Sequence, residues 1–80
     1  MNVASIKHLI ESYSLDELTK AEQDLLSETP LSISVEGKDE GEQLTHLLAA
    51  VWCKVQMEKE GMPLNAAIRQ YSQRVRNSIN

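Results

Sequence analysis

Hydrophobic and polar positions repeat with a helical period along most of the chain, and this pattern predicts four helices. Apolar side chains that recur every three or four residues mark the buried face of a helix. Such stripes predict helices over about residues 3–12, 15–27, 40–60 and 65–78. Ser14 and Glu17 have capping-box spacing, and Gly61 follows the third stripe, so local signals support these boundaries. The expected fold class is mostly α, in a single helical domain of residues 1–80.

Residues 31–36 break the helical period. Leu31, Ile33 and Val35 alternate with polar neighbours, which is the pattern of a short extended or β segment with one buried side. A single strand leaves backbone donors and acceptors unpaired along both edges. We therefore expect either a solvated connector or a strand that pairs with the same segment of a second copy, which makes these three residues interface candidates.

The helix expected at 40–60 has two non-polar faces. The bulky face covers an arc of about 140° and is the expected core; its members are Leu44, Leu47, Leu48, Val51, Trp52 and Val55. The small-residue face lies nearly opposite and consists of Glu42, His46, Ala49, Ala50, Cys53 and Met57. Ala49, Ala50 and Cys53 would let another helix approach closely, so we expect a subunit interface at Ala49, Ala50, Cys53 and Met57. The alternative is packing against the first or last helix of the same chain.

The composition adds an argument for association. A domain of 80 residues buries only about 60% of its unfolded surface, and large side chains are scarce, with no Phe, one Trp and two Tyr. Small domains are commonly stabilised by a disulfide, a metal or a second subunit. Cys53 is the single cysteine, so no internal disulfide can form, and this also fits a reducing cytosol. We therefore expect a homodimer.

Charge and hydropathy narrow the choice of partners. The net charge is −4, which does not favour nucleic acid as a default partner. Residues 1–40 hold nine acids and three bases, and residues 41–80 hold three acids and five bases, an asymmetry that can favour intramolecular or head-to-tail pairing. The chain has no signal-peptide pattern and no run of about 18 apolar residues. We expect a cytoplasmic protein without a membrane partner.

Glu42 and His46 are the residues that could carry chemistry. Their spacing of four places both side chains on one helical face, where they could bind a divalent metal or form a carboxylate-oriented base. A metal site needs three or four ligands, and Cys53 lies about 10 Å further along the helix axis. We favour a hydrogen-bonded or surface histidine, an inert buried thiol at Cys53, and no cofactor.

Arg69 and Arg76 share one side of the last helix, while Arg74 points elsewhere. Two cations on one face are a candidate anion or nucleic-acid site, although no aromatic residues are interleaved with them. Arginines near a helix C-terminus also interact favourably with the helix dipole. The second explanation is the one we favour.

Two segments, Tyr13–Leu26 and Val35–Trp52, resemble a family of small uncharacterised bacterial proteins of about this length. This family is associated with the Bacteroidota and is described only as a domain of unknown function. The resemblance implies a stand-alone bacterial cytoplasmic protein, and no activity, ligand or catalytic residue comes with it.

We expect a non-catalytic protein–protein interaction or assembly and regulatory module that acts as a homodimer, with a further protein partner that the residues do not identify. One alternative is a small metal- or ligand-binding protein or enzyme that uses Glu42 and His46. A second alternative is anion or nucleic-acid binding through Arg69 and Arg76.

Overall fold

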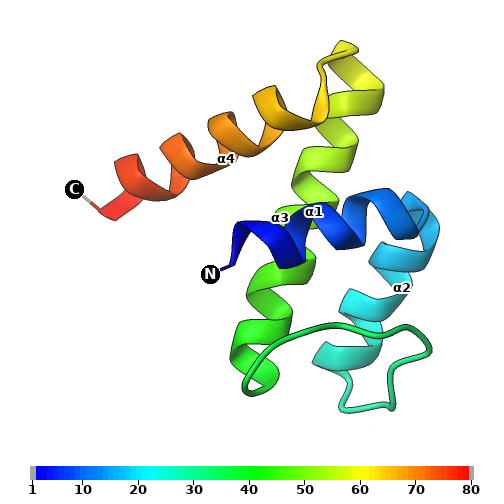
Figure 1. Ribbon diagram of the computed structural model, residues 1–80. Coiled ribbons are helices and arrows are strands. Elements are labelled where there is room, and N and C mark those ends of the chain that lie inside the picture. The colour runs from blue at the N-terminus through cyan, green and yellow to red at the C-terminus, as the bar shows by residue number, and fades with distance from the viewer. Residues whose placement is uncertain (1, 80) are drawn as a thin grey trace.

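The computed structural model describes residues 2–79, with side chains described for residues 2–77, and its helices are shown in Figure 1. The four helices are α1 Val3–Ser12, α2 Leu15–Leu26, α3 Glu40–Glu60 and α4 Leu64–Ile79. The bounds of α1 and α3 are as predicted, α2 ends one residue earlier, and α4 is one residue longer at each end. The four predicted helices are confirmed, and the described part of the chain is all-α, without the short β segment that the sequence also suggested.

Local capping explains why the helices begin and end where they do. The Ser14 hydroxyl accepts from the amide of Glu17 at 3.1 Å, and the Glu17 carboxylate accepts from the amide of Ser14 at 2.9 Å. Asp39 accepts from the amide of Glu42 at the start of α3. Gly61 ends α3 with a φ of 67°, which glycine adopts without a side-chain clash. The predicted signals at Ser14, Glu17 and Gly61 are therefore confirmed.

Helix α3 is the centre of the fold, and α1, α2 and α4 each pack against it (Figure 1). Helix α2 runs antiparallel to α3, because Leu15 lies beside Lys54 and Leu25 lies beside Gln43. Helix α4 starts near the C-terminal end of α3 and extends away from the body along its second half (Figure 1).

The small-residue face of α3 is the core, and the bulky face is largely not. Ala49, Ala50 and Cys53 are all 0% exposed, whereas Leu48 on the bulky face is 43% exposed. Of the six bulky-face residues only Leu47 is fully buried, and the others are half-buried or exposed. The physical reason is close approach: small side chains let neighbouring helices lie near the α3 backbone, whereas large side chains would hold them apart. The prediction that the bulky face is the core is wrong for Leu44, Leu48 and Val55, whereas Leu47 is buried and Val51 and Trp52 pack against the core.

Residues 31–36 form no strand in the described part of the chain, and we call them the strap. Val35 is buried and Leu31 and Ile33 are half-buried, so the alternating apolar side chains cover the core of the same molecule. Side chains from the helices satisfy part of the strap backbone. Gln43 Nε2 donates to the carbonyl of Val35 at 3.0 Å, and the amide of Ser34 donates to the Tyr13 hydroxyl at 3.4 Å. The strap thus needs no second copy to pair these groups, and this argument for a dimer is withdrawn.

Lys54 joins α3 to the C-terminal end of α1. Its Nζ atom donates to the carbonyl oxygens of Ile10 at 2.8 Å and of Tyr13 at 2.6 Å. The last carbonyls of a helix have no partner within the helix, and a cation there also interacts favourably with the helix dipole. A half-buried lysine therefore fixes where α1 ends against α3.

Candidate functional site

His46 is a structural residue that connects three segments of the chain. It is 1% exposed. Its Nε2 atom accepts from the amide of Asn2 at 3.1 Å, and its Nδ1 atom lies 2.8 Å from the carbonyl oxygen of Glu36. A carbonyl can only accept, so these partners assign the neutral tautomer with the proton on Nδ1. The imidazole therefore holds the start of α1 and the end of the strap against α3.

Glu42 does not form a shared site with His46. Its carboxylate accepts from the amide of Lys38 at 3.0 Å, immediately before the start of α3. Both ring nitrogens of His46 already have partners, so neither offers a lone pair to a metal in this arrangement. Within the described residues, no three His, Cys, Asp or Glu side chains come together in a group that could hold a metal ion.

The Cys53 thiol lies in the core, where water does not reach it. It is 0% exposed, and burial raises the pKa of the Cys53 thiol to about 11. The thiolate is the reactive form of cysteine, so this environment suppresses reactivity. Cys53 is thus a buried thiol, as the sequence favoured.

The interface candidates on the small-residue face are covered by the chain itself. Ala49, Ala50 and Cys53 have no exposed surface, and Met57 is half-buried against the core. In the structure these residues pack within the monomer, which is the alternative that the sequence left open. Leu31, Ile33 and Val35 of the strap also face the core of their own chain. We therefore withdraw both groups as candidate contacts to a second copy.

The exposed apolar surface of α3 lies on the opposite side of the helix. We call Leu44, Leu48, Val51 and Val55 the α3 stripe; their spacing of four, three and four residues places them within an arc of about 60°. Leu48 is 43% exposed and the other three are half-buried. The stripe lies about 180° around the helix from Ala49, Ala50 and Cys53. Val51 also packs against the core, so the stripe is a partly exposed apolar line on the side of α3 opposite the small-residue face.

Trp52 lies beside the α3 stripe, four residues after Leu48, and contacts α4. Its ring centroid is 5.7 Å from that of Tyr71, and the Arg74 guanidinium carbon lies 5.2 Å from the Trp52 ring centroid. Burial and the neighbouring Cys53 raise the pKa of Tyr71, and Arg74 opposes this shift. The guanidinium over an indole face is a cation–π contact, which fixes the middle of α4 on α3.

A hollow of about 350 Å³ opens next to this contact. Its lining combines the indole ring, the guanidinium and three side-chain amides, from Trp52, Gln70, Gln73, Arg74 and Asn77. Half-buried Trp52 is the only apolar member. The α3 stripe is thus bordered on the α4 side by a polar rim that surrounds an aromatic ring.

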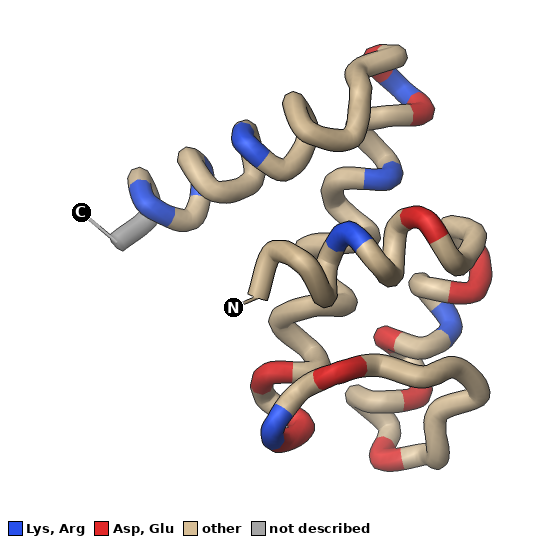
Figure 2. Tube along the Cα trace, viewed as in Figure 1, with Lys and Arg blue, Asp and Glu red and all other residues tan. Residues whose placement is uncertain are grey.

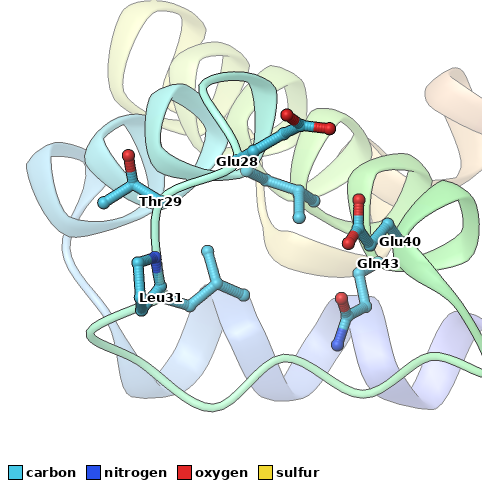
Figure 3. Close-up of a pocket in the computed structure, with 7 residues that line it drawn as sticks. Glu28, Thr29, Leu31, Glu40 and Gln43 are labelled. Atoms are coloured by element: carbon cyan, nitrogen blue, oxygen red, sulfur yellow. The ribbon is translucent and has the colours of Figure 1, made fainter.

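A second hollow, of about 310 Å³, lies where α2 meets the start of α3 (Figure 3). Its lining residues are Leu25, Glu28, Thr29, Pro30, Leu31, Glu40 and Gln43. Glu28 and Glu40 both line the hollow, and both residues are exposed. Gln43 is used to hold the strap. Two solvated carboxylates do not provide the three or four ligands of a metal site.

Glu28 has a backbone conformation that is unusual for a side-chain-bearing residue. Its φ is 59°, in the left-handed region, directly after the end of α2. The amides of Glu28 and Thr29 donate to the carbonyls of Leu25 and Asp24, at 3.2 Å and 2.8 Å. These two bonds form a Schellman motif, in which the left-handed position is normally glycine. The strain at Glu28 is explained by the way in which α2 ends.

Charge is divided between the two ends of the molecule (Figure 2). Acidic residues surround α2, the strap and the start of α3, and α4 carries three arginines and no acid. Arg69 and Arg76 are exposed, and the structure describes no ion pair for either of them. Of the three arginines, it is Arg74 that stacks on an aromatic ring, and this separates it from the other two.

The fold and the surface together define a small all-helical protein whose surface carries an apolar helical stripe with an aromatic and arginine border. No helix in residues 2–79 is both long enough and apolar enough to cross a membrane. The whole chain, residues 1–80, matches a family model described as "Family of unknown function (DUF6952)", and the protein belongs to this family. No curated protein and no solved structure matches it. The match confirms the resemblance to a family of unknown function.

Sequence reasoning assigned the residues of the stripe to the core and did not identify the border of the stripe. The contact of Trp52 with Arg74 joins positions that are 22 residues apart, on two helices whose relative placement no local pattern predicts. One signal was present: Trp52 is the one residue of the bulky face that is aromatic, and the chain has no other tryptophan.

Proposed function

We propose that the protein is a non-catalytic interaction or assembly module that acts as a homodimer, and that the α3 stripe is the interface. The observation that carries this proposal is a line of four aliphatic side chains on the longest helix, of which Leu48 is exposed and the other three are half-buried. Isolated exposed apolar side chains are ordinary, but a continuous helical line of them is typical of a binding surface.

The pattern of the α3 stripe supports a second copy as the occupant. Steps of four, three and four residues are those of a coiled-coil seam, in which one helix packs against another of the same pattern. In a two-fold dimer both subunits use the same surface. A stripe with coiled-coil spacing can pack against an identical stripe, so it meets this requirement. Residues of this chain thus supply both sides of the contact.

The small size of the core supports the same proposal. Several of the buried positions are occupied by Ala or Cys, which bury little area each. Small domains commonly gain stability from association when no disulfide or metal is present. Burial of apolar surface stabilises by about 25 cal/mol per Å² removed from water. Burial of the α3 stripe in a dimer would therefore add to the stability that the small core provides.

Light scattering of the purified chain over a range of micromolar concentrations tests this proposal. We expect a mass of twice the 9.0 kDa chain, falling toward 9.0 kDa on dilution. A mass of 9.0 kDa at every concentration, with helical circular dichroism, would contradict it. A larger complex that forms only with another cellular protein would replace the homodimer by a hetero-assembly on the same surface.

A further inference from the structure

We propose that Trp52 and Arg74 form one edge of the dimer interface, so that α4 as well as α3 binds the second copy. This inference rests on the homodimer proposed above. It extends the proposed interface beyond the aliphatic α3 stripe to a polar and aromatic border.

The size of the α3 stripe makes an extension necessary. A stable interface buries about 800 Å² on each partner and involves about 20 residues or more. Leu48 is 43% exposed, and Leu44, Val51 and Val55 are less exposed, so these four side chains supply only part of that area. A second copy on the stripe must therefore also contact what lies beside it.

The two sides of the α3 stripe differ in what they offer. On the α2 side lie polar and charged residues and Leu15, with no aromatic ring, and Lys54 there already donates to two carbonyls at the end of α1. On the α4 side lie Trp52 and Arg74, of the residue types that contribute most to protein–protein binding. The chemistry of the surface therefore favours the α4 side.

Trp52 is placed where a partner helix must meet it. It follows Leu48 by four residues and precedes Val55 by three, so its ring is adjacent to both along the surface of α3. In a helix pair the positions that flank the seam contact the partner. The adjoining hollow of about 350 Å³ gives a side chain of the second copy room to enter beside the ring.

The position of α4 is consistent with this role. Gln73 and Asn77, which line the hollow, belong to the second half of α4, and this half extends from the body (Figure 1). Helices of this length are marginal in water unless one face is packed. A second copy seated on the stripe covers this part of α4, and the amides can pair with polar groups at the rim of the interface.

The test combines dimer dissociation constants with the fluorescence of Trp52, the single tryptophan. We expect Trp52 emission to shift to shorter wavelength as concentration rises, with the same midpoint as the mass. Arg74→Ala should raise the dissociation constant about tenfold or more. Arg69→Ala, which removes the same charge from another side of α4, is the matched control and should change it less than about twofold.

The outcomes separate this inference from the proposal on which it rests. A wild-type chain that stays at 9.0 kDa contradicts both. A dimer whose formation leaves Trp52 emission unchanged, and in which Arg74→Ala and Arg69→Ala behave alike, overturns the inference and leaves the homodimer in place. Circular dichroism of both variants confirms that each is folded before the comparison is made.

Discussion

His46 and Leu48, two residues apart on α3, lie on opposite sides of the helix, and the histidine is the buried one. His46 is 1% exposed and Leu48 is 43% exposed. A polar group is buried at low cost only when it is hydrogen-bonded, and both ring nitrogens of His46 are. The buried histidine therefore stabilises the monomer, and the exposed leucine is left for contacts outside it.

His46→Phe should destabilise the fold by about 2 kcal/mol, because it keeps most of the volume but leaves the amide of Asn2 and the carbonyl of Glu36 without their partner. Urea denaturation followed by circular dichroism measures this. His8→Phe, at an exposed position of α1, is the control and should change stability by less than about 0.5 kcal/mol. Equal stabilities of the two variants would argue against a structural role for His46.

Lys54→Met should cost about 2 kcal/mol, because two carbonyls at the end of α1 lose a charged donor. Lys59→Met is the matched control: it removes the same charge from the same helix at an exposed position. The two variants are compared by thermal and urea denaturation. If Lys59→Met were as damaging as Lys54→Met, net charge rather than the capping contact would explain the loss.

Glu28→Gly should stabilise the protein by about 0.5–1 kcal/mol, because glycine adopts the left-handed conformation without strain. The φ of Glu28 is 59°, and its amide lies within the Schellman motif that ends α2. Glu22→Gly, inside α2, should instead destabilise by about 1 kcal/mol. The opposite signs of the two changes are the diagnostic result, and a loss of stability at both positions would contradict this account of how α2 ends.

Alkaline pH should destabilise the protein through Cys53. Burial raises the pKa of the thiol from 9.0 to about 11, so its contribution is present below pH 9 and is lost as the pH rises to about 11. The loss should be about 3 kcal/mol, from two pH units at 1.36 kcal/mol each. Urea denaturation across this pH range measures it, and Cys53→Ala should remove most of the dependence. An unchanged dependence in that variant would assign the effect to other groups.

The helices could be predicted from the sequence because the signals that define them are local. The capping box of Ser14 and Glu17 and the left-handed Gly61 each depend on a few neighbouring residues. The start of α2 and the end of α3 follow directly from such signals. The predicted inertness of Cys53 also rests on a local feature, the lack of an activating neighbour in mid-helix.

The buried side of α3 could not be predicted in the same way, because both of its faces are apolar. Periodicity identifies a face, but which face the other helices cover depends on contacts between distant residues. Asn2 with His46 and Ile10 with Lys54 are each separated by 44 positions. Bulk suggested that Leu48 was core, whereas close packing of helices uses the small side chains at Ala49 and Ala50.

The strap shows the same limit. Its alternating pattern correctly indicated one buried side, but its hydrogen-bond partners come from Tyr13 and Gln43, outside the segment. A pattern within six residues cannot contain those contacts. The unpaired edges that suggested a strand across a dimer are partly satisfied by side chains of the same molecule.

The central claim is that the protein associates through the α3 stripe and folds around the small-residue face. The most direct test is sedimentation equilibrium of Leu48→Glu beside the wild type, with Ala50→Glu as the core control and circular dichroism on all three. We predict a wild-type dimer, a folded monomer for Leu48→Glu, and an unfolded chain for Ala50→Glu, whose side chain has no exposed surface. The same mass for Leu48→Glu and the wild type would contradict the claim.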